Sequence, residues 1–267
     1  MIRLIFSDMD GTLLDENGKL PAEFGDVYRR LTEHGVRFAP ASGRQYASLL
    51  QTFAPWKDEL IFVAENGTMV MERGKELFSH TVDRALALDV MRTGEAIPNV
   101  HAVLCGKKQG YLHMDDDVHA FRMELAKYVT QTAVVEDFAA VDDAPIKMSF
   151  CDFTGNAATT IFPVMEQYTD RLQVTLSSSE WVDLYSLGVN KGVAATRIRE
   201  QLGLAPEECA AFGDYGNDLE LMDSVAYSFA MENAIPAVKE RARYTAPSNR
   251  EHGVMTVCEQ ILAGTFD

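Results

Sequence analysis

The stretch Asp8-Met9-Asp10-Gly11-Thr12-Leu13-Leu14 begins just after a short apolar run, Leu4-Ile5-Phe6. Such a run is typical of a buried strand, so two carboxylates are expected where that strand ends. Like charges beside an apolar strand are costly to bury unless a cation offsets them, and a divalent metal can do this. Gly11 permits a sharp turn, while Thr12 offers a hydroxyl and a backbone N–H to an anion. The alternative is an ordinary polar turn after a strand, because Asp and Gly are common turn residues.

The composition limits the classes of partner. The chain has 267 residues, 47% of them hydrophobic and 24% charged, with a formal net charge of -16. This length accommodates one large domain or two modest ones. The negative charge disfavours nucleic acid or an anionic membrane surface as the main partner. No apolar stretch is long enough to span a membrane and no secretory signal precedes the first strand, so we expect a cytoplasmic protein. The composition does not define an oligomeric state.

The cysteines carry no metal-binding or disulfide pattern. The four of them, Cys105, Cys151, Cys209 and Cys258, are widely spaced and form no CxxC motif. Buried, reduced thiols are therefore predicted.

The first 64 residues alternate between strand and helix signals. Apolar residues recur at helical spacing over residues 24–31, a second strand is predicted over 36–41, a second helix over 46–53, and a third strand over 60–63. Strands alternating with helices in this way favour a parallel sheet covered on both faces. Functional residues of such sheets gather at the carboxyl ends of the strands. Asp8 and Ser42 both follow predicted strands and are expected to converge.

The middle of the chain has a different pattern. A hairpin is predicted over residues 69–79, and then strands over 100–105, 111–114, 146–151, 172–176 and 181–185, with helices near 82–90, 121–128 and 157–168. Adjacent strands and hairpins indicate an antiparallel or mixed sheet. We interpret residues 82–185 as an inserted α/β domain that divides a discontinuous core of residues 1–81 and 186–267. The acidic run Asp115-Asp116-Asp117 is interpreted as a solvated helix start and not as a site.

Three further segments carry candidate site residues. Ser42-Gly43-Arg44 follows a strand, so the hydroxyl, a backbone N–H and the guanidinium can bind an anion, although Ser42 can equally be a helix cap and Arg44 a solvated residue. Lys191 begins a predicted helix, where the dipole disfavours a cation, and this conflict hints at function; the alternative is an exposed lysine. Gly213-Asp214-Tyr215-Gly216-Asn217-Asp218 follows an apolar strand, and its Asp214 and Asp218 can face one point or form a polar turn.

These segments, in this order, resemble the four signature motifs of the haloacid dehalogenase-like (HAD) hydrolases, which are mostly phosphatases. The resemblance covers essentially the full chain. The inserted block lies between the second and third motifs, which resembles the Cof-type branch with a large α/β cap. The resemblance implies an α/β fold, a doubly wound parallel-sheet, Rossmann-like HAD core with an inserted α/β cap domain.

The resemblance also implies a division of roles for phosphate-ester hydrolysis through an aspartyl-phosphate. The implied catalytic residues are Asp8 as nucleophile, Asp10 as general acid and base, and Lys191. The implied cofactor is Mg²⁺, held by Asp8, the Asp10 backbone carbonyl and Asp214, with Asp218 as a supporting residue. The implied phosphate- or substrate-binding residues are Thr12, Ser42, Gly43, Arg44 and Asn217. The expected substrate is a small phosphorylated metabolite, such as a sugar phosphate or a phosphorylated cofactor.

Two alternatives share these motifs. One is a phosphotransferase or phosphomutase on the same scaffold, and the other is a non-catalytic module that binds phosphorylated ligands.

Overall fold

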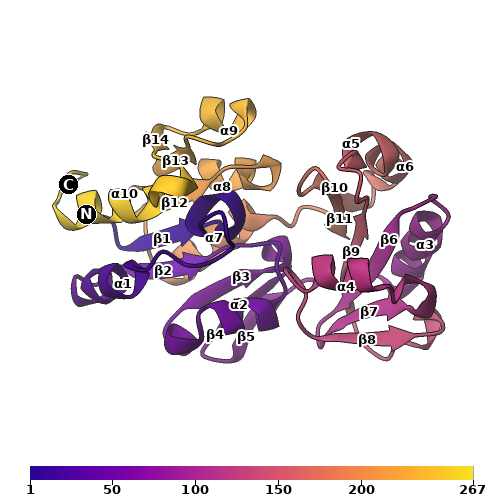
Figure 1. Ribbon diagram of the computed structural model, residues 1–267. Helices are drawn as coiled ribbons and strands as arrows, with labels where there is room; N and C mark the ends of the chain where they lie inside the picture. The colour runs from indigo at the N-terminus through magenta and orange to yellow at the C-terminus, as the bar shows by residue number, and fades with distance from the viewer. Residues whose placement is uncertain (267) are drawn as a thin grey trace.

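The computed structural model describes residues 1–266 and is built around two large sheets that lie beside each other, with a small third sheet of three strands (Figure 1). The first sheet is parallel throughout and has the strand order β14-β13-β12-β1-β2. Its strands are β1 (Leu4–Ser7), β2 (Arg37–Pro40), β12 (Cys209–Gly213), β13 (Tyr227–Met231) and β14 (Tyr244–Ala246). The central strands are buried along their length, as their unbroken apolar sequences predict.

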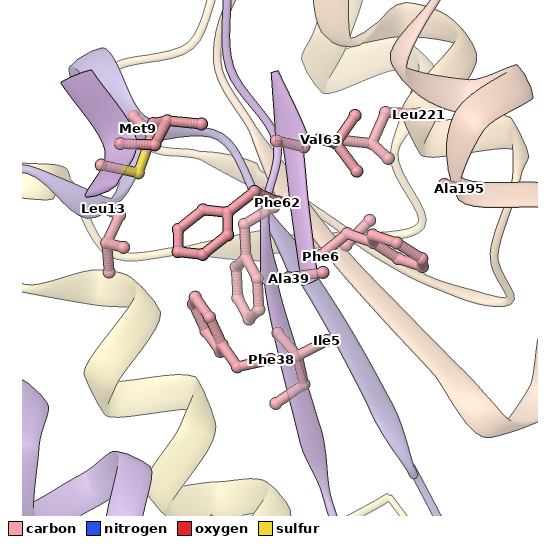
Figure 2. Packing of buried hydrophobic residues seen from close by; sticks show 14 of the residues in the cluster. Ile5, Phe6, Met9, Leu13, Phe38, Ala39, Phe62, Val63, Ala195 and Leu221 are labelled. Atoms are coloured by element: carbon pink, nitrogen blue, oxygen red, sulfur yellow. The ribbon is translucent and has the colours of Figure 1, made fainter. Parts of the chain in front are cut away.

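Helices cover both faces of this parallel sheet. They are α1 (Phe24–Glu33), α2 (Tyr46–Thr52), α7 (Lys191–Gln201), α8 (Leu219–Asp223), α9 (Pro236–Arg241) and α10 (Gly253–Leu262). Successive strand residues point to opposite faces. Figure 2 shows Phe38 and Phe62 on the side of Leu13, whereas Phe6 points toward Ala195 of α7 and Leu221 of α8. The predicted doubly wound α/β arrangement is therefore confirmed.

The third predicted strand belongs to a small sheet of its own. β3 (Ile61–Ala64) pairs antiparallel with β4 (Met69–Glu72), which pairs with β5 (Lys75–Ser79), so the predicted hairpin is confirmed. β3 meets β2 through a single parallel bridge between Ala41 and Val63. The backbone N–H of Ser42 donates to the carbonyl of Val63, so alternate N–H groups of this segment face β3. Pro40, two residues earlier, would also face β3 but has no N–H to donate. This explains why β2 and β3 do not form a regular series of hydrogen bonds.

The second sheet spans residues 101–186, so its last strand passes the predicted boundary at 185 by one residue. Its order is β10-β11-β9-β6-β7-β8, and all neighbours are antiparallel except β7 and β8, which confirms a mixed sheet. Its strands are β6 (His101–Gly106), β7 (Gly110–His113), β8 (Thr132–Val135), β9 (Pro145–Cys151), β10 (Leu172–Leu176) and β11 (Trp181–Ser186). One face of this sheet packs on α3 (Arg84–Glu95) and on the helices that follow β9. Apolar residues of the opposite face and of α4 (His119–Leu125) belong to the same buried cluster as the core. The exact domain boundaries stay a prediction.

Two expectations for secondary structure were wrong. The helix predicted over residues 157–168 is divided into α5 (Ala157–Thr160), α6 (Phe162–Met165) and a further single turn. Pro163 lacks the N–H that a continuous helix would need. The short strands β8 and β14 were not predicted; each has at most four residues, too few for a clear alternation of apolar and polar side chains.

All four cysteines are buried and free, as expected. Over residues 1–266, no helix combines the length and apolarity that crossing a bilayer requires. The cytoplasmic location stays a prediction.

Candidate active site

The site lies where β1 and β12, neighbours in the parallel sheet, both end. The backbone N–H of Asp8 donates to the carbonyl of Phe212 at 3.0 Å, so the segments after both strands start side by side. The loop after Asp8 bends back sharply at Gly11, whose φ is +78°. A Cβ at Gly11 would lie 2.4 Å from Oδ2 of Asp214. Only glycine therefore lets this loop approach the second carboxylate so closely.

Three buried or nearly buried carboxylates gather at this point. Ligand atoms of Asp8, Asp214 and Asp218 all lie within 4.8 Å of one another. Lys191, fully buried at the start of α7, donates to Oδ1 of Asp8 at 2.5 Å and to Oδ1 of Asp218 at 2.7 Å. The cation that the helix dipole disfavours is thus held by two anions. These contacts bring the first, third and fourth motifs together at one point.

The electrostatics of this cluster favour a further cation. Burial raises the pKa of Asp8 well above its ordinary value, and the charge of Asp218 raises it further, against the lowering effect of Lys191. Burial and the charge of Asp218 likewise raise the pKa of Asp214 to about 7. Burial alone would lower the pKa of Lys191, but the two carboxylates outweigh it and the pKa is raised. One lysine therefore does not balance the cluster.

The oxygen atoms of the cluster fit a hard divalent cation. Both oxygens of Asp218 are engaged, Oδ1 by Lys191 and Oδ2 by the backbone N–H groups of Asp214 and Tyr215 at 3.0 and 3.2 Å. Asp8 and Asp214 each accept a side-chain hydrogen bond on Oδ1, from Lys191 and from Thr12. Within residues 1–266, no such bond reaches Oδ2 of either, so those two atoms suit a metal and Asp218 suits a supporting role.

The side chain of Asp10 does not join the three-carboxylate cluster. Arg44 binds it in a forked geometry, with Nε 2.8 Å from Oδ2 and Nη2 2.5 Å from Oδ1. The guanidinium also lies over the ring of Tyr128, 5.7 Å from its centroid. Arg44, expected to contact an anion of the substrate, therefore already binds the carboxyl group of Asp10. This pair joins the first and second motifs, and within the second motif the backbone N–H of Arg44 donates to Oγ of Ser42 at 3.1 Å.

A cavity of about 190 Å³, partly open to solvent, lies over this cluster between the two sheets. Its floor includes Asp8, Asp10, Ser42, Gly43, Arg44, Asp214 and Asn217 from the core. Residues 82–185 add an apolar side and a polar side, formed by Val103, Leu125, Tyr128, Val129 and Trp181 and by Lys147, Ser149, Ser177, Ser178 and Asp183. Most of the predicted site residues thus border one space, and the remaining three, Thr12, Lys191 and Asp218, contact residues that line it.

A buried polar network at the edge of this cavity was not predicted. Asp183 of β11 accepts hydrogen bonds from Ser149 at 2.5 Å, from Ser177 at 2.6 Å and from Asn66 at 2.8 Å. Asn66 in turn accepts one from Asn217 at 3.1 Å, which connects the network to the fourth motif. The sequence feature that could have indicated this network is Asp183, an isolated charge within the apolar strand predicted over 181–185. A charge is rarely buried in such a strand without partners.

Two asparagines that the sequence left without a role hold the first motif. Asn233 donates to the carbonyl of Gly11 at 2.8 Å, and Asn249 donates to that of Leu14 at 2.9 Å. The backbone N–H of Asn249 donates to the side chain of Asn233 at 3.1 Å. These contacts fix the loop that carries Asp10.

This fold and motif order define the class. The chain belongs to the haloacid dehalogenase-like hydrolase family, whose model matches residues 5–257, and has the capped architecture of the Cof type. Its relatives are named phosphatases, which places it among the phosphoric monoester hydrolases. It is similar to the 5-amino-6-(5-phospho-D-ribitylamino)uracil phosphatase YbjI of Escherichia coli K12, with 32% identity over 98% of this chain and 96% of that protein. It is also similar to the HMP-PP phosphatase of Serratia proteamaculans, with 27% identity over 90% of this chain and 87% of that protein.

Solved structures show the same architecture. A crystal structure from Streptococcus mutans UA159 has a TM-score of 0.90 and 28% identity over 98% of this chain and 100% of that one. A HAD subclass IIB sugar phosphatase has a TM-score of 0.83 and 17% identity over 97% of this chain and 98% of that chain, which shows the shared fold.

Proposed function

We propose that this chain hydrolyses phosphate monoesters of small metabolites with Mg²⁺, through a phosphoryl group carried on Asp8. The observation that supports this most strongly is the arrangement of Lys191 with Asp8, beside Asp214, beneath a cavity that can take a small molecule. A carboxylate nucleophile needs a dry site in which cations offset the negative charge of the phosphate. The buried lysine supplies one such charge, and the unbalanced carboxylates provide for another.

Mg²⁺ would be held by Asp8, Asp214 and the backbone carbonyl of Asp10. When bound, it supplies positive charge to the phosphoryl oxygens and offsets their repulsion by the carboxylates. This binding requires both Asp8 and Asp214 to be ionised.

The chain's own residues would carry the chemical steps. A carboxylate oxygen of Asp8 attacks phosphorus, the bond from phosphorus to the ester oxygen breaks, and Asp10, which starts the cycle protonated, gives that proton to the leaving alkoxide. Asp10, now ionised, takes a proton from a water molecule, whose oxygen attacks phosphorus and releases inorganic phosphate and free Asp8. Arg44 keeps Asp10 oriented for both transfers. Lys191, the hydroxyl of Ser42 and the N–H groups of Gly43 and Thr12 would stabilise the phosphoryl oxygens.

The leaving group would occupy the space between the sheets. The apolar side, with Tyr128 and Trp181, suits the body of a metabolite, and the polar side around Ser149 and Asp183 suits its hydroxyl or amide groups. Asn217 would contact the substrate near the floor of the same space. The named relatives act on small phosphorylated compounds, so we place the substrate among sugar phosphates and phosphorylated cofactors.

The test is inorganic phosphate release from a panel of phosphorylated metabolites, with Mg²⁺ and with EDTA. We expect release that EDTA abolishes and that differs among the compounds. The same reactions with an added sugar acceptor separate hydrolysis from phosphoryl transfer. A phosphorylated acceptor in place of free phosphate would identify a transferase, and no reaction by folded, metal-bound protein would favour a binding module.

A further inference from the structure

Lys147 is a buried lysine of the cap whose two nearest partners belong to the core, while Asp183 of the cap lies farther away, at 3.9 Å. It lies in β9, a strand buried along its whole length, and its side chain is almost completely enclosed. Its ammonium donates to the backbone carbonyl of Gly43 at 2.7 Å and lies 2.7 Å from Oε2 of Glu65. Gly43 and Glu65 follow β2 and β3, so this one side chain joins the second sheet to the edge of the active site.

We propose that Lys147 is a positioning residue for the reaction: from the cap, it fixes the Ser42–Arg44 segment in the geometry that binds the phosphoryl group and orients Asp10. This inference rests on the proposed function, because it assigns Lys147 to the phosphoryl-binding segment of that reaction. Lys147 itself makes no bond in the mechanism and acts through the carbonyl of Gly43.

The Ser42–Arg44 segment is arranged so that one displacement moves two functional groups. Ser42, which would bind a phosphoryl oxygen, precedes Gly43, and Arg44, which holds Asp10, follows it. A Cβ at Gly43 would lie 3.1 Å from the side-chain oxygen of Asn66, so the segment packs closely on its core side. On the other side, Lys147 holds the Gly43 carbonyl. Errors of about 1 Å in such positions can lower a rate by roughly 10²-fold.

The turn formed by Glu65 and Asn66, on the core side of this segment, also depends on contacts with the cap. Glu65 and Asn66 both have left-handed backbones, with φ of 52° and 57°, a conformation that is unfavourable for residues other than glycine. The side chain of Glu65 pairs with Lys147, and that of Asn66 donates to Asp183 at 2.8 Å. Both partners are cap residues. The backbone N–H of Asn66 donates to the carbonyl of Ser42 at 2.9 Å, so this turn also supports the phosphoryl-binding segment.

The charge of Lys147 also balances that of Glu65, and the experiment must separate this structural role from the contact with Gly43. Glu65 is buried, and removing one partner of a buried ion pair strongly destabilises a protein, whereas replacing both is often tolerated. Lys147→Met alone is therefore at risk of unfolding. The double variant Lys147→Met/Glu65→Gln removes the pair as a unit and still leaves the Gly43 carbonyl without its donor. Lys127→Met is the matched control, because Lys127 is a cap lysine paired with Glu124 at the surface.

The measurements are kcat, KM and the binding of inorganic phosphate with Mg²⁺ by calorimetry. We expect the folded double variant to lose roughly 10²-fold in kcat/KM, mainly in kcat, and to bind phosphate at least about tenfold more weakly. Lys127→Met should match the wild type. A double variant with wild-type kcat/KM and phosphate affinity would overturn the inference, since Lys147 would then only balance Glu65. Phosphate binding answers the question even if the wild type hydrolyses no ester, an outcome that would count against the proposed function alone.

Discussion

Arg44 holds the carboxylate of Asp10 through two hydrogen bonds, 2.8 Å from Nε to Oδ2 and 2.5 Å from Nη2 to Oδ1. The pair joins the segment after β1 to the segment after β2, although 34 positions separate the two residues. A forked guanidinium fixes both the position and the rotation of a carboxylate. The Asp10 side chain therefore lines the cavity and points away from the three-carboxylate cluster.

If Asp10 is the general acid and base, Asp10→Asn should slow both half-reactions. We expect a loss of about 10²–10⁴-fold in kcat for an alkyl phosphate, the range typical of a lost general acid or base. The loss of phosphorylation rate should be smaller with p-nitrophenyl phosphate, because nitrophenolate leaves without a proton. Rapid-quench kinetics with both substrates would measure this difference. A variant altered only in its affinity for Mg²⁺ would show that the assigned role of Asp10 is wrong.

Gly11 should be required for activity beyond its effect on stability. Both Gly11→Ala and Gly18→Ala place a Cβ on a left-handed residue, at φ of 78° and 69°. Each should therefore lower the free energy of unfolding by about 1–2 kcal/mol, measured by urea denaturation. Only the Cβ at Gly11 meets Asp214, whereas that at Gly18 has no heavy atom within 4 Å. We expect Gly11→Ala to lose at least about 10²-fold in kcat/KM and Gly18→Ala to keep it. Equal activities would contradict the packing described for the first motif.

Mg²⁺ should stabilise the folded protein through Asp214. An ion that binds only the folded state raises the free energy of unfolding by about 2.7 kcal/mol at a concentration 100 times its Kd. Thermal unfolding of the wild type should therefore shift upward with Mg²⁺, and the shift should largely disappear in Asp214→Asn. Asp170→Asn changes an exposed carboxylate and should retain it. A full shift in Asp214→Asn would remove Asp214 from the metal site.

Much of the site could be predicted because its residues lie at ends of strands in a parallel sheet. The apolar runs before Asp8 and Asp214 indicate buried strands, and the carboxyl ends of such strands meet at one edge. The local conflict at Lys191, a cation at a helix start, was also a correct signal, because Asp8 and Asp218 hold it there. These predictions depend on short stretches of sequence and on a general property of the fold.

The polar network between cap and core could not be predicted in the same way. Lys147 and Asp183 lie on antiparallel cap strands whose order and register decide which core residues they meet. Strand order is a long-range property that local pattern does not contain. Glu65 and Asn66 also have left-handed backbones that their residue types only weakly indicate. The signal that remains is a charged residue within each of two apolar strands.

The measurement that tests the central claim most directly is phosphate release by Asp8→Asn beside Asp15→Asn, with Mg²⁺ and the best substrate of the wild type. Asp15 lies just beyond the first motif, where its side chain accepts from the backbone N–H groups of Asn17 and Lys19. In Asp8→Asn the buried Lys191 keeps its second carboxylate partner, Asp218, so we expect the variant to stay folded, which urea denaturation checks. We predict that folded Asp8→Asn loses at least about 10³-fold in kcat while Asp15→Asn retains full activity. Substantial turnover by Asp8→Asn would contradict the account, because no phosphoryl group could then pass through Asp8.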